Sequence, residues 1–201
     1  MEAAINRRHW AERSGEFSPT YYAHLGPNEV SRHLVELLDE HVERDAAILE
    51  LGCSAGRHLA HLHDNGFTNL HGIDINDRSF EVMAEYFPSL AEHGSFEAAA
   101  IERFVPQRAD REFDVVYSVQ TLQHVHEDDA WVFAELARIT GQLLVTVENE
   151  GDGEGGVKYV DDELPLYYRN WAEIFTNLGF VERATERRTY DTTRVFERSG
   201  Q

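Results

Sequence analysis

Cysteine, lysine and long hydrophobic runs are almost missing from this sequence, and each shortage excludes a class of protein. The single cysteine, Cys53, rules out an intrachain disulfide and fits a reducing cytoplasm. No apolar run is long enough to cross a membrane, and residues 1–17 lack the apolar centre of a signal peptide. We therefore expect a cytoplasmic protein without a membrane-spanning segment, whose 201 residues form one domain with a sizeable core.

Positive charge is also scarce. Lysine and arginine together number 18 against 37 acidic residues, which gives a formal net charge of −19, and Lys158 is the only lysine. Such a field repels nucleic acids and acidic membranes, so neither is expected as a partner. The composition fits either an ordinary acidic enzyme or a protein of a salt-loving organism. In the second case salt would screen the field, and charge alone would no longer exclude an RNA substrate.

The stretch that organises the rest of the chain is residues 46–75. An apolar run at 46–51 stops at a turn over 52–56, a helical pattern follows, and a second apolar run at 70–75 contains Asp74. This order of strand, glycine turn, helix and strand indicates a βαβ unit with a small-molecule pocket at the carboxyl ends of its strands. An acidic side chain at the end of the second strand can accept hydrogen bonds from both hydroxyls of a ribose.

The spacing of the turn helps to choose between two nucleoside ligands. A dinucleotide fingerprint requires G-x-G-x-x-G, but Ser54 and Arg57 stand at its second and third glycine positions, which disfavours an NAD-dependent oxidoreductase. S-adenosylmethionine has no phosphate. It requires a turn that permits close approach, an acid for the ribose and an apolar slot for adenine. Four residues can supply these features: Gly52, Gly56, Asp74 and Ile75.

Three segments carry a family resemblance. ELGCSAGRHL, which begins at Glu50, resembles the first motif of class I S-adenosylmethionine-dependent methyltransferases, E/D-x-G-C-G-x-G, with Ser54 at the usual middle glycine. GIDI at 72–75 is similar to their second-strand motif, and FDVVYSVQTLQHV at 113–125 resembles their fourth strand and following loop. The resemblance covers roughly residues 30–182 in matching order, and the combination is far more specific than a lone GxxxG.

The resemblance implies a fold and an activity. The fold is α/β and Rossmann-like: a doubly wound, mostly parallel seven-stranded sheet with helices on both faces and a C-terminal antiparallel strand pair. Residues 28–201 would form this domain, and residues 1–27 an N-terminal arm or lid. The activity is methyl transfer from S-adenosylmethionine, which leaves S-adenosylhomocysteine, to a small-molecule acceptor. The alternative is a non-catalytic cofactor-binding protein or partner subunit.

The resemblance also assigns cofactor roles to single residues. Glu50 would lie near the amino group of the cofactor, Asp74 would bind the ribose, and Gln120 would face the methionine tail. Backbone groups of the turn and an apolar pair around adenine complete the set: Gly52, Cys53, Gly56, Ile75 and Ile101. The acid that often recognises the adenine amino group is missing, because Ala100 stands at that position. Backbone groups or Glu102 would replace it.

The N-terminal arm and the histidines leave more than one interpretation open. Tyr21 and Tyr22 either stack on a ligand or pack outside the sheet, and for Trp10 packing is favoured. His124, directly after the fourth strand, could take a proton from the acceptor or could orient its loop, and His126 could serve instead. Three histidines of the first helix after the glycine turn are expected on a solvated face, and no metal site is expected: His58, His61 and His63.

Further elements follow from capping residues and periodicity. Asn28 and Asn170 are expected to cap helices, and a stripe of Phe80, Met83, Ala84 and Phe87 is expected to be core. The remaining expectations are a third strand at 96–101, a fifth strand at 143–147, a mobile loop at 151–156 and a terminal antiparallel pair within 180–199.

Overall fold

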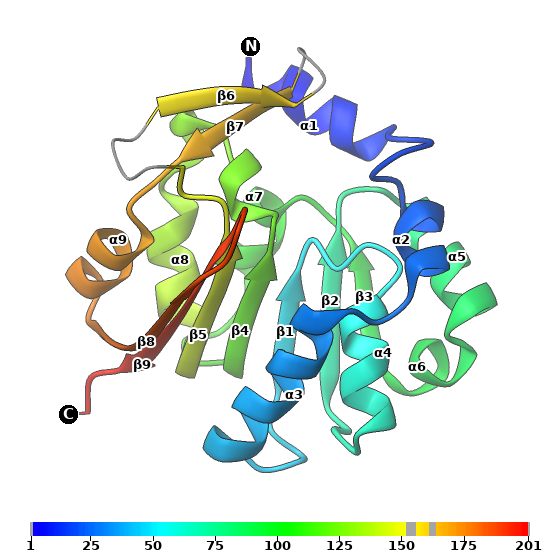
Figure 1. Cartoon of the computed structure of the whole chain (residues 1–201), viewed down its shortest axis with the longest axis horizontal. Helices are drawn as coiled ribbons and strands as arrows, with labels where there is room; N and C mark the ends of the chain where they lie inside the picture. Colours follow the sequence, from blue (N-terminus) through cyan, green and yellow to red (C-terminus); the bar gives the residue numbers. More distant parts are fainter. Residues whose placement is uncertain (1, 152–155, 161–163, 201) are drawn as a thin grey trace.

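A seven-stranded sheet forms the centre of the protein (Figure 1). The structure is a computed structural model that describes residues 2–151, 156–160 and 164–200. The strands follow the order β3-β2-β1-β4-β5-β9-β8 across the sheet. Their bounds are β1 Ile48–Leu51, β2 Leu70–Asp74, β3 Ser95–Ala98, β4 Phe113–Val119, β5 Thr140–Glu148, β8 Phe180–Arg187 and β9 Thr192–Arg198.

The pairing within the sheet confirms the expected fold class. Strands β1 to β5 are parallel to their neighbours, whereas β9 runs antiparallel to both β5 and β8. The order of the parallel strands reverses between β1 and β4, because β1 pairs with β2 on one side and with β4 on the other. Chains of this topology form a ligand crevice at that switch point, outside the carboxyl ends of the strands.

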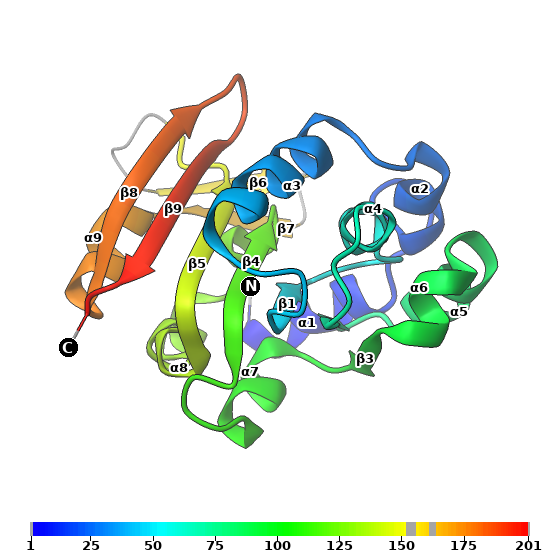
Figure 2. The ribbon, with the colours of Figure 1, turned by 90° about the horizontal axis from the view of Figure 1, so that it is seen from below.

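Helices cover both faces of the sheet, and each face has its own hydrophobic cluster. Figure 2 shows α3 (Glu29–His41) and α4 (Arg57–Asp64) on one side of the strands, and α7 (Ile101–Phe104) and α8 (Val132–Ile139) on the other. The first cluster is completed by α5 (Arg78–Tyr86) and α6 (Pro88–His93), the second by α9 (Trp171–Asn177). Alternate strand residues point to opposite clusters, as in a sheet buried on both faces.

Two helix starts follow directly from their capping residues. Asn28 accepts a hydrogen bond from the Ser31 backbone N–H (3.1 Å), and the Ser31 hydroxyl accepts one from the Asn28 N–H (3.0 Å). Asn170 accepts a hydrogen bond from the Glu173 N–H (3.1 Å) at the start of α9. Both expected caps are thus confirmed, and each satisfies a backbone donor that the helix leaves without an internal acceptor.

Two expected strand bounds and one expected core residue were wrong. The third strand ends at Ala98 rather than continuing to residue 101, because the chain turns at Ala99 and Ala100 and begins α7 at Ile101. The fifth strand is longer than expected, since it extends from Thr140 to Glu148 between β4 and β9. Within α5 the side chain of Ala84 is exposed, and Val82 is buried instead.

The carboxyl-end side of the sheet carries elements that the sequence did not predict. A hairpin of β6 (Gly156–Val160) and β7 (Leu164–Tyr168) forms a separate two-stranded sheet. Together with α1 (Ala3–Ala11) it lies above the ends of the strands (Figure 1). Of the loop expected at 151–156, residues 152–155 lie outside the described residues. Among the helices that the structure describes, none is long and apolar enough to cross a bilayer.

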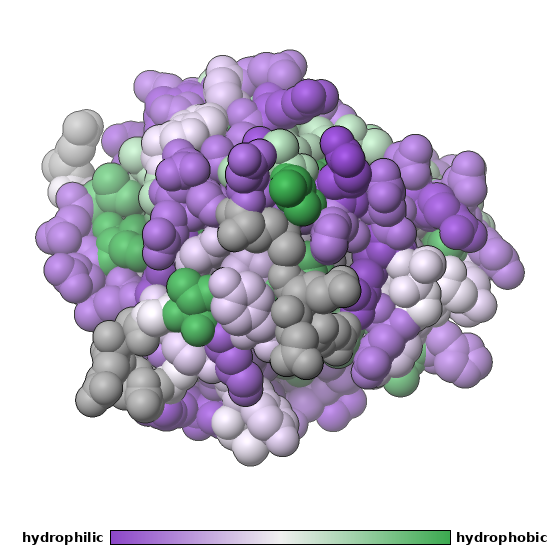
Figure 3. Space-filling model, turned by 90° about the horizontal axis from the view of Figure 1, so that it is seen from above, coloured by the Kyte–Doolittle hydropathy of each residue, from purple (hydrophilic) through white to green (hydrophobic). Residues whose placement is uncertain are grey.

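The N-terminal arm folds into two helices. Helix α1 contacts β7 and the short helix η3 (Glu127–Asp129), and α2 (Pro19–Leu25) packs against α5. The arm therefore closes one side of the space above the switch point. Seen from above, this face is largely hydrophilic among the residues coloured, with hydrophobic side chains confined to small separate areas (Figure 3).

Candidate functional site

A cavity of about 330 Å³ lies at the switch point, between the carboxyl ends of the central strands and the N-terminal arm. Its floor comes from the ends of β1, β2 and β4 and from the turns that follow them. Its roof comes from α1 and from Leu166 of β7. The lining therefore joins parts of the chain that are far apart in sequence, as expected for a crevice of this fold.

The glycine turn after β1 has a geometry that few side chains would tolerate. Gly52 has φ +65°, and a Cβ there would lie 2.3 Å from the Thr121 hydroxyl. Gly56, which begins α4, has φ +81°, and a Cβ there would meet the Met83 side chain at 2.7 Å. Gly52 lines the cavity, whereas Gly56 is absent from its lining.

Ser54 occupies a backbone conformation that favours glycine. Its φ is +51°, in the left-handed region where a side chain is strained by about 1 kcal/mol. In this conformation its backbone N–H donates to Asp74 Oδ2 (2.7 Å). The middle residue of the turn thus links the end of β1 to the end of β2.

Asp74 is held for hydrogen bonding to a ligand. Its Oδ2 accepts from the Ser54 N–H and its Oδ1 from the Asn76 N–H (2.8 Å). Each carboxylate oxygen has a second acceptor position beyond the one that the backbone uses. Burial raises the pKa of Asp74, and the two backbone donors partly offset this effect. The arrangement suits a pair of adjacent hydroxyl donors in the cavity.

Glu50 lies deeper in the floor of the cavity. Its side chain is 2% exposed, and its Oε2 accepts from the Tyr117 hydroxyl (2.9 Å). Burial raises the pKa of the Glu50 carboxyl to about 8, although the Tyr117 hydrogen bond and the Arg57 guanidinium favour the charged form. A cationic group in the cavity would shift this balance further toward the carboxylate.

An apolar slot lies on the other side of Asp74. Ile75, Ala99, Ala100 and Ile101 line the cavity there, and Glu102 lies beside them with its carboxylate paired to Arg7. Ile75 and Ile101, which the sequence analysis expected around an adenine ring, both line this apolar part of the cavity. The Glu102 carboxylate is partly engaged by Arg7 (3.5 Å).

Gln120 also lines the cavity, but its side chain is already engaged. Its Nε2 donates to Asp191 Oδ2 (2.8 Å), so that the end of β4 is linked to the turn between β8 and β9. The Gln120 backbone has φ +52°, and its N–H donates to the Val147 carbonyl (2.8 Å). Its backbone and its side-chain oxygen are the groups that can face a ligand.

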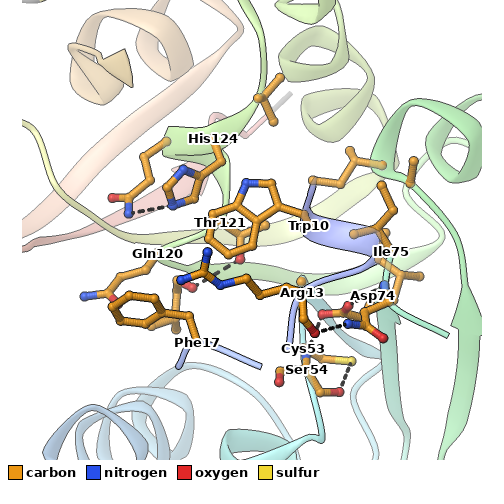
Figure 4. Close-up of a pocket in the computed structure, with 18 of the residues that line it drawn as sticks. Trp10, Arg13, Phe17, Cys53, Ser54, Asp74, Ile75, Gln120, Thr121 and His124 are labelled. Carbon is orange, nitrogen blue, oxygen red and sulfur yellow. Dashed lines mark hydrogen bonds between the residues drawn. The ribbon is translucent and has the colours of Figure 1, made fainter. Parts of the chain in front are cut away.

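The N-terminal arm contributes a tryptophan that was expected to pack outside the sheet. Trp10 instead lines the cavity, and its ring lies 4.5 Å from that of His124 (centroid to centroid). In the view of Figure 4 the Trp10 ring lies between His124 and Ile75. Tyr22 lines the cavity, with the Arg57 guanidinium 4.7 Å from its ring centroid, whereas Tyr21 is exposed and outside the lining.

His124 is neutral and engaged at both ring nitrogens. Its Nδ1–H donates to the Pro165 carbonyl (3.1 Å), and Nε2 faces the Gln123 amide nitrogen (3.3 Å). Burial lowers the pKa of His124 to about 4. A group with this pKa is a weak base at neutral pH, because efficient general bases titrate near the working pH.

Two other residues hold the loop that carries His124, and sequence reasoning missed both. Glu148, fully buried at the end of β5, accepts from the backbone N–H groups of Thr121, Leu122 and Gln123, and from Ser118. Arg169 donates to the carbonyls of Leu122 and Val125. For Glu148 the sequence did offer a signal, because its carboxylate stands at the end of a continuous apolar strand.

The histidines of α4 were expected on a solvated face, and for His58 this was wrong. His58 is buried, and its Nδ1 shares a hydrogen bond with the Ser31 hydroxyl (2.8 Å) between α3 and α4. Burial lowers the pKa of His58 to about 3. Cys53 is also buried, and burial raises the pKa of its thiol, which favours the unreactive form. Among the described residues, no group of three or more ligand-type side chains could hold a metal ion.

Four cavity-lining residues carry a buried polar atom without a hydrogen-bond partner within the described structure. They are Asn6 (Oδ1), Trp10 (Nε1), Ser54 (Oγ) and Asp191 (Oδ1). Buried polar atoms are normally satisfied, so a group of them around one cavity fits a site that receives polar groups. With Asp74, the apolar slot and Glu50, the residues present fit an adenosyl group that carries an amino-acid tail.

Comparison with known proteins supports the same conclusion. Residues 48–142 match a family described as "Methyltransferase domain". The chain is 22% identical over 189 residues to phosphoethanolamine N-methyltransferase 3 of Arabidopsis thaliana, and this match covers 88% of the chain but only 37% of that protein's length.

Two solved structures share the fold. The 1,6-didemethyltoxoflavin-N1-methyltransferase of Burkholderia thailandensis, with its substrate and S-adenosylhomocysteine bound, gives a TM-score of 0.69 at 16% identity, over 86% of this chain and 79% of that one. The magnesium protoporphyrin IX methyltransferase of Synechocystis PCC 6803, with bound S-adenosylhomocysteine, gives 0.67 at 16% identity, over 98% of this chain and 94% of that one. The methyltransferase-domain match thus covers residues 48–142, and the two solved methyltransferases share the Rossmann-like fold of this chain.

Proposed function

We propose that the protein transfers a methyl group from S-adenosylmethionine to a small-molecule acceptor bound in the same cavity. One observation carries this proposal: the glycine turn after β1 and the Asp74 carboxylate after β2 meet at the floor of one cavity, joined by the Ser54 N–H. The relatives named above are methyltransferases that are named after small-molecule acceptors.

The chain's own residues divide the work of binding. Asp74 would accept from both ribose hydroxyls, Ile75 and Ile101 would enclose adenine, and Glu50 would face the ammonium group of the tail. When bound, the cofactor supplies a methyl group that its sulfonium already activates. The protein then has to align the acceptor and exclude water, which the roof formed by α1 and β7 can do.

We propose that His124 positions the active-site loop rather than acting as a base. Both of its ring nitrogens are engaged, and its pKa of about 4 makes it a poor proton acceptor at neutral pH. Its ring also supports Trp10, whose side chain forms part of the wall against which the acceptor would lie.

Replacement of Asp74 by alanine tests the cofactor assignment. The change removes a charged acceptor from two hydroxyls and should weaken S-adenosylhomocysteine binding by about 1–3 kcal/mol in titration calorimetry. A matched control is Asp77→Ala, since Asp77 follows the same strand but is absent from the cavity lining. Equal affinity of wild type and the Asp74 variant would contradict the assignment. Incubation with labelled S-adenosylmethionine and a metabolite pool then identifies the acceptor, and no labelled product would favour a non-catalytic subunit.

The net charge and the buried thiol indicate the redox state and the salt concentration of the surroundings in which the protein acts. We propose a reducing, cytoplasmic setting, supported by a single buried cysteine. We further propose a high salt concentration, supported by the net charge of −19. Nucleic acid is not proposed as a substrate, because the methyltransferases named above act on small molecules.

A further inference from the structure

A second hollow of about 300 Å³ adjoins the cavity on the side of the turn between β8 and β9. It shares three lining residues with the cavity: Asn149, Tyr190 and Asp191. The rest of its wall comes from the end of β5, from β6 and β7, and from the segment between β8 and β9. A molecule in the cavity could therefore extend into this hollow.

Positive charge gathers in this second hollow. Lys158, the chain's only lysine, lines it together with Arg187 and Arg188. Two acids also line it. Glu150 is contacted by Arg194 at both carboxylate oxygens (2.6 and 2.8 Å), a guanidinium that also binds Glu182, and Asp191 accepts from Gln120. Basic side chains thus outnumber acidic ones by three to two in the lining, whereas over the whole chain acids outnumber bases by 37 to 18.

Two of these cations are available to a ligand. Lys158 is exposed on β6 and makes no hydrogen bond or ion pair within the described part of the chain. Arg187 donates from Nη2 to the Gly151 carbonyl (2.8 Å), which occupies only part of its guanidinium. Arg188 differs from them, because it is engaged by Glu186 and Glu29 at 3.2 and 3.5 Å.

We propose that this hollow, defined by Lys158, Arg187 and Tyr168 and called the cationic annex below, binds an oxyanion group of the methyl acceptor. Ammonium, guanidinium and phenol groups are the donors that phosphates and carboxylates prefer. The acceptor would place its nucleophile in the cavity and its anionic group in the annex. This inference rests on the proposed methyltransferase function and adds the class of substrate: a small molecule that carries a phosphate or a carboxylate.

The test measures oxyanion binding to the full chain saturated with S-adenosylhomocysteine. Sodium phosphate and, separately, sodium acetate are titrated at constant ionic strength, and the melting temperature is recorded. We expect at least one oxyanion to raise the melting temperature of the wild type. A response to phosphate assigns a phosphate group to the acceptor, and a response to acetate assigns a carboxylate.

Variants locate the binding site. Lys158→Gln combined with Arg187→Gln should weaken the apparent oxyanion affinity by about tenfold or more, whereas Lys158→Arg should retain it. The control is Arg183→Gln, which removes an exposed arginine of β8 paired with Glu197 and should keep wild-type affinity. Since Lys158 is exposed, Lys158→Gln alone serves as the second variant if the double variant does not fold.

Two results would overturn the inference: no response of the wild type to either oxyanion, or an equal response of wild type and the Lys158 and Arg187 variants. Calorimetry with S-adenosylhomocysteine on the same samples keeps the two proposals separate. If the wild type did not bind S-adenosylhomocysteine, the proposed function would be contradicted. The oxyanion titration would then be repeated without the cofactor, and its result would still test the annex.

Discussion

Glu50 links pH to both the stability of the free protein and its affinity for the cofactor. Burial raises the pKa of its carboxyl from 4.5 to about 8, so the folded protein holds a proton there that the unfolded chain loses above pH 4.5. The stabilising contribution is therefore complete below the unfolded pKa and is lost as pH rises toward 8. Between pH 5 and pH 7 the free energy of unfolding should fall by about 2–3 kcal/mol from this group alone.

Cofactor affinity should rise with pH, whereas the stability of the free protein falls. An ammonium group beside Glu50 favours the carboxylate, and with a pKa of about 8 only about a tenth of the protein carries that carboxylate at pH 7. Binding of S-adenosylhomocysteine should then release a large part of one proton at pH 7, and affinity should rise with pH from pH 6 to pH 7, by at most about tenfold per pH unit.

Calorimetry in buffers of different ionisation enthalpy measures the released proton directly. The matched variant is Glu50→Gln, which keeps an acceptor for the Tyr117 hydroxyl and removes the titration. Glu148, whose pKa is also raised, to about 7, stays in both proteins, so the difference between them isolates Glu50. If wild type released no proton at pH 7, or if the variant showed the same pH dependence of affinity, the placement of Glu50 beside the cofactor's amino group would be refuted.

Three further outcomes are expected. Gly52→Ala should lower the free energy of unfolding by about 2–4 kcal/mol in denaturant melts, because the new Cβ would clash with Thr121 at a position of positive φ. The control is Gly66→Ala, at a position with φ +91° and open space around it, which should lower the free energy of unfolding by only about 1 kcal/mol. Ser54→Gly should raise the free energy of unfolding by up to about 1 kcal/mol while S-adenosylhomocysteine affinity is kept, since the backbone N–H makes the contact to Asp74; a loss of stability would mean that the serine side chain is needed. Melting temperature should rise with sodium chloride between low and molar concentrations, since screening relieves repulsion within a chain of net charge −19, and a fall would contradict adaptation to high salt.

The sequence alone was sufficient for the parts of the site that depend on local pattern. Apolar runs that end in a glycine turn and in Asp74 predicted the βαβ unit, and parallel strands in this order bring their carboxyl ends together. The caps at Asn28 and Asn170 followed from the same local rules, because a capping bond joins residues three apart in the chain.

Only the tertiary structure decided which distant side chains reach the cavity. Trp10 lies against His124 because α1 folds back over the strand ends, and no periodicity within α1 indicates that contact. His58 is buried because α3 packs against α4 and brings Ser31 to its ring, although the helix pattern placed it on a solvated face.

The hairpin of β6 and β7 shows the same limit of local pattern. It completes the roof and brings Lys158 to the same hollow as Arg187, which lies 29 residues further along the chain. Sequence determined the floor of the cavity, because the glycine turn and Asp74 belong to contiguous motifs. The roof and the side next to the annex are built from long-range contacts between the arm, the hairpin and the β8–β9 turn, and such contacts are set by packing in three dimensions rather than by neighbouring residues.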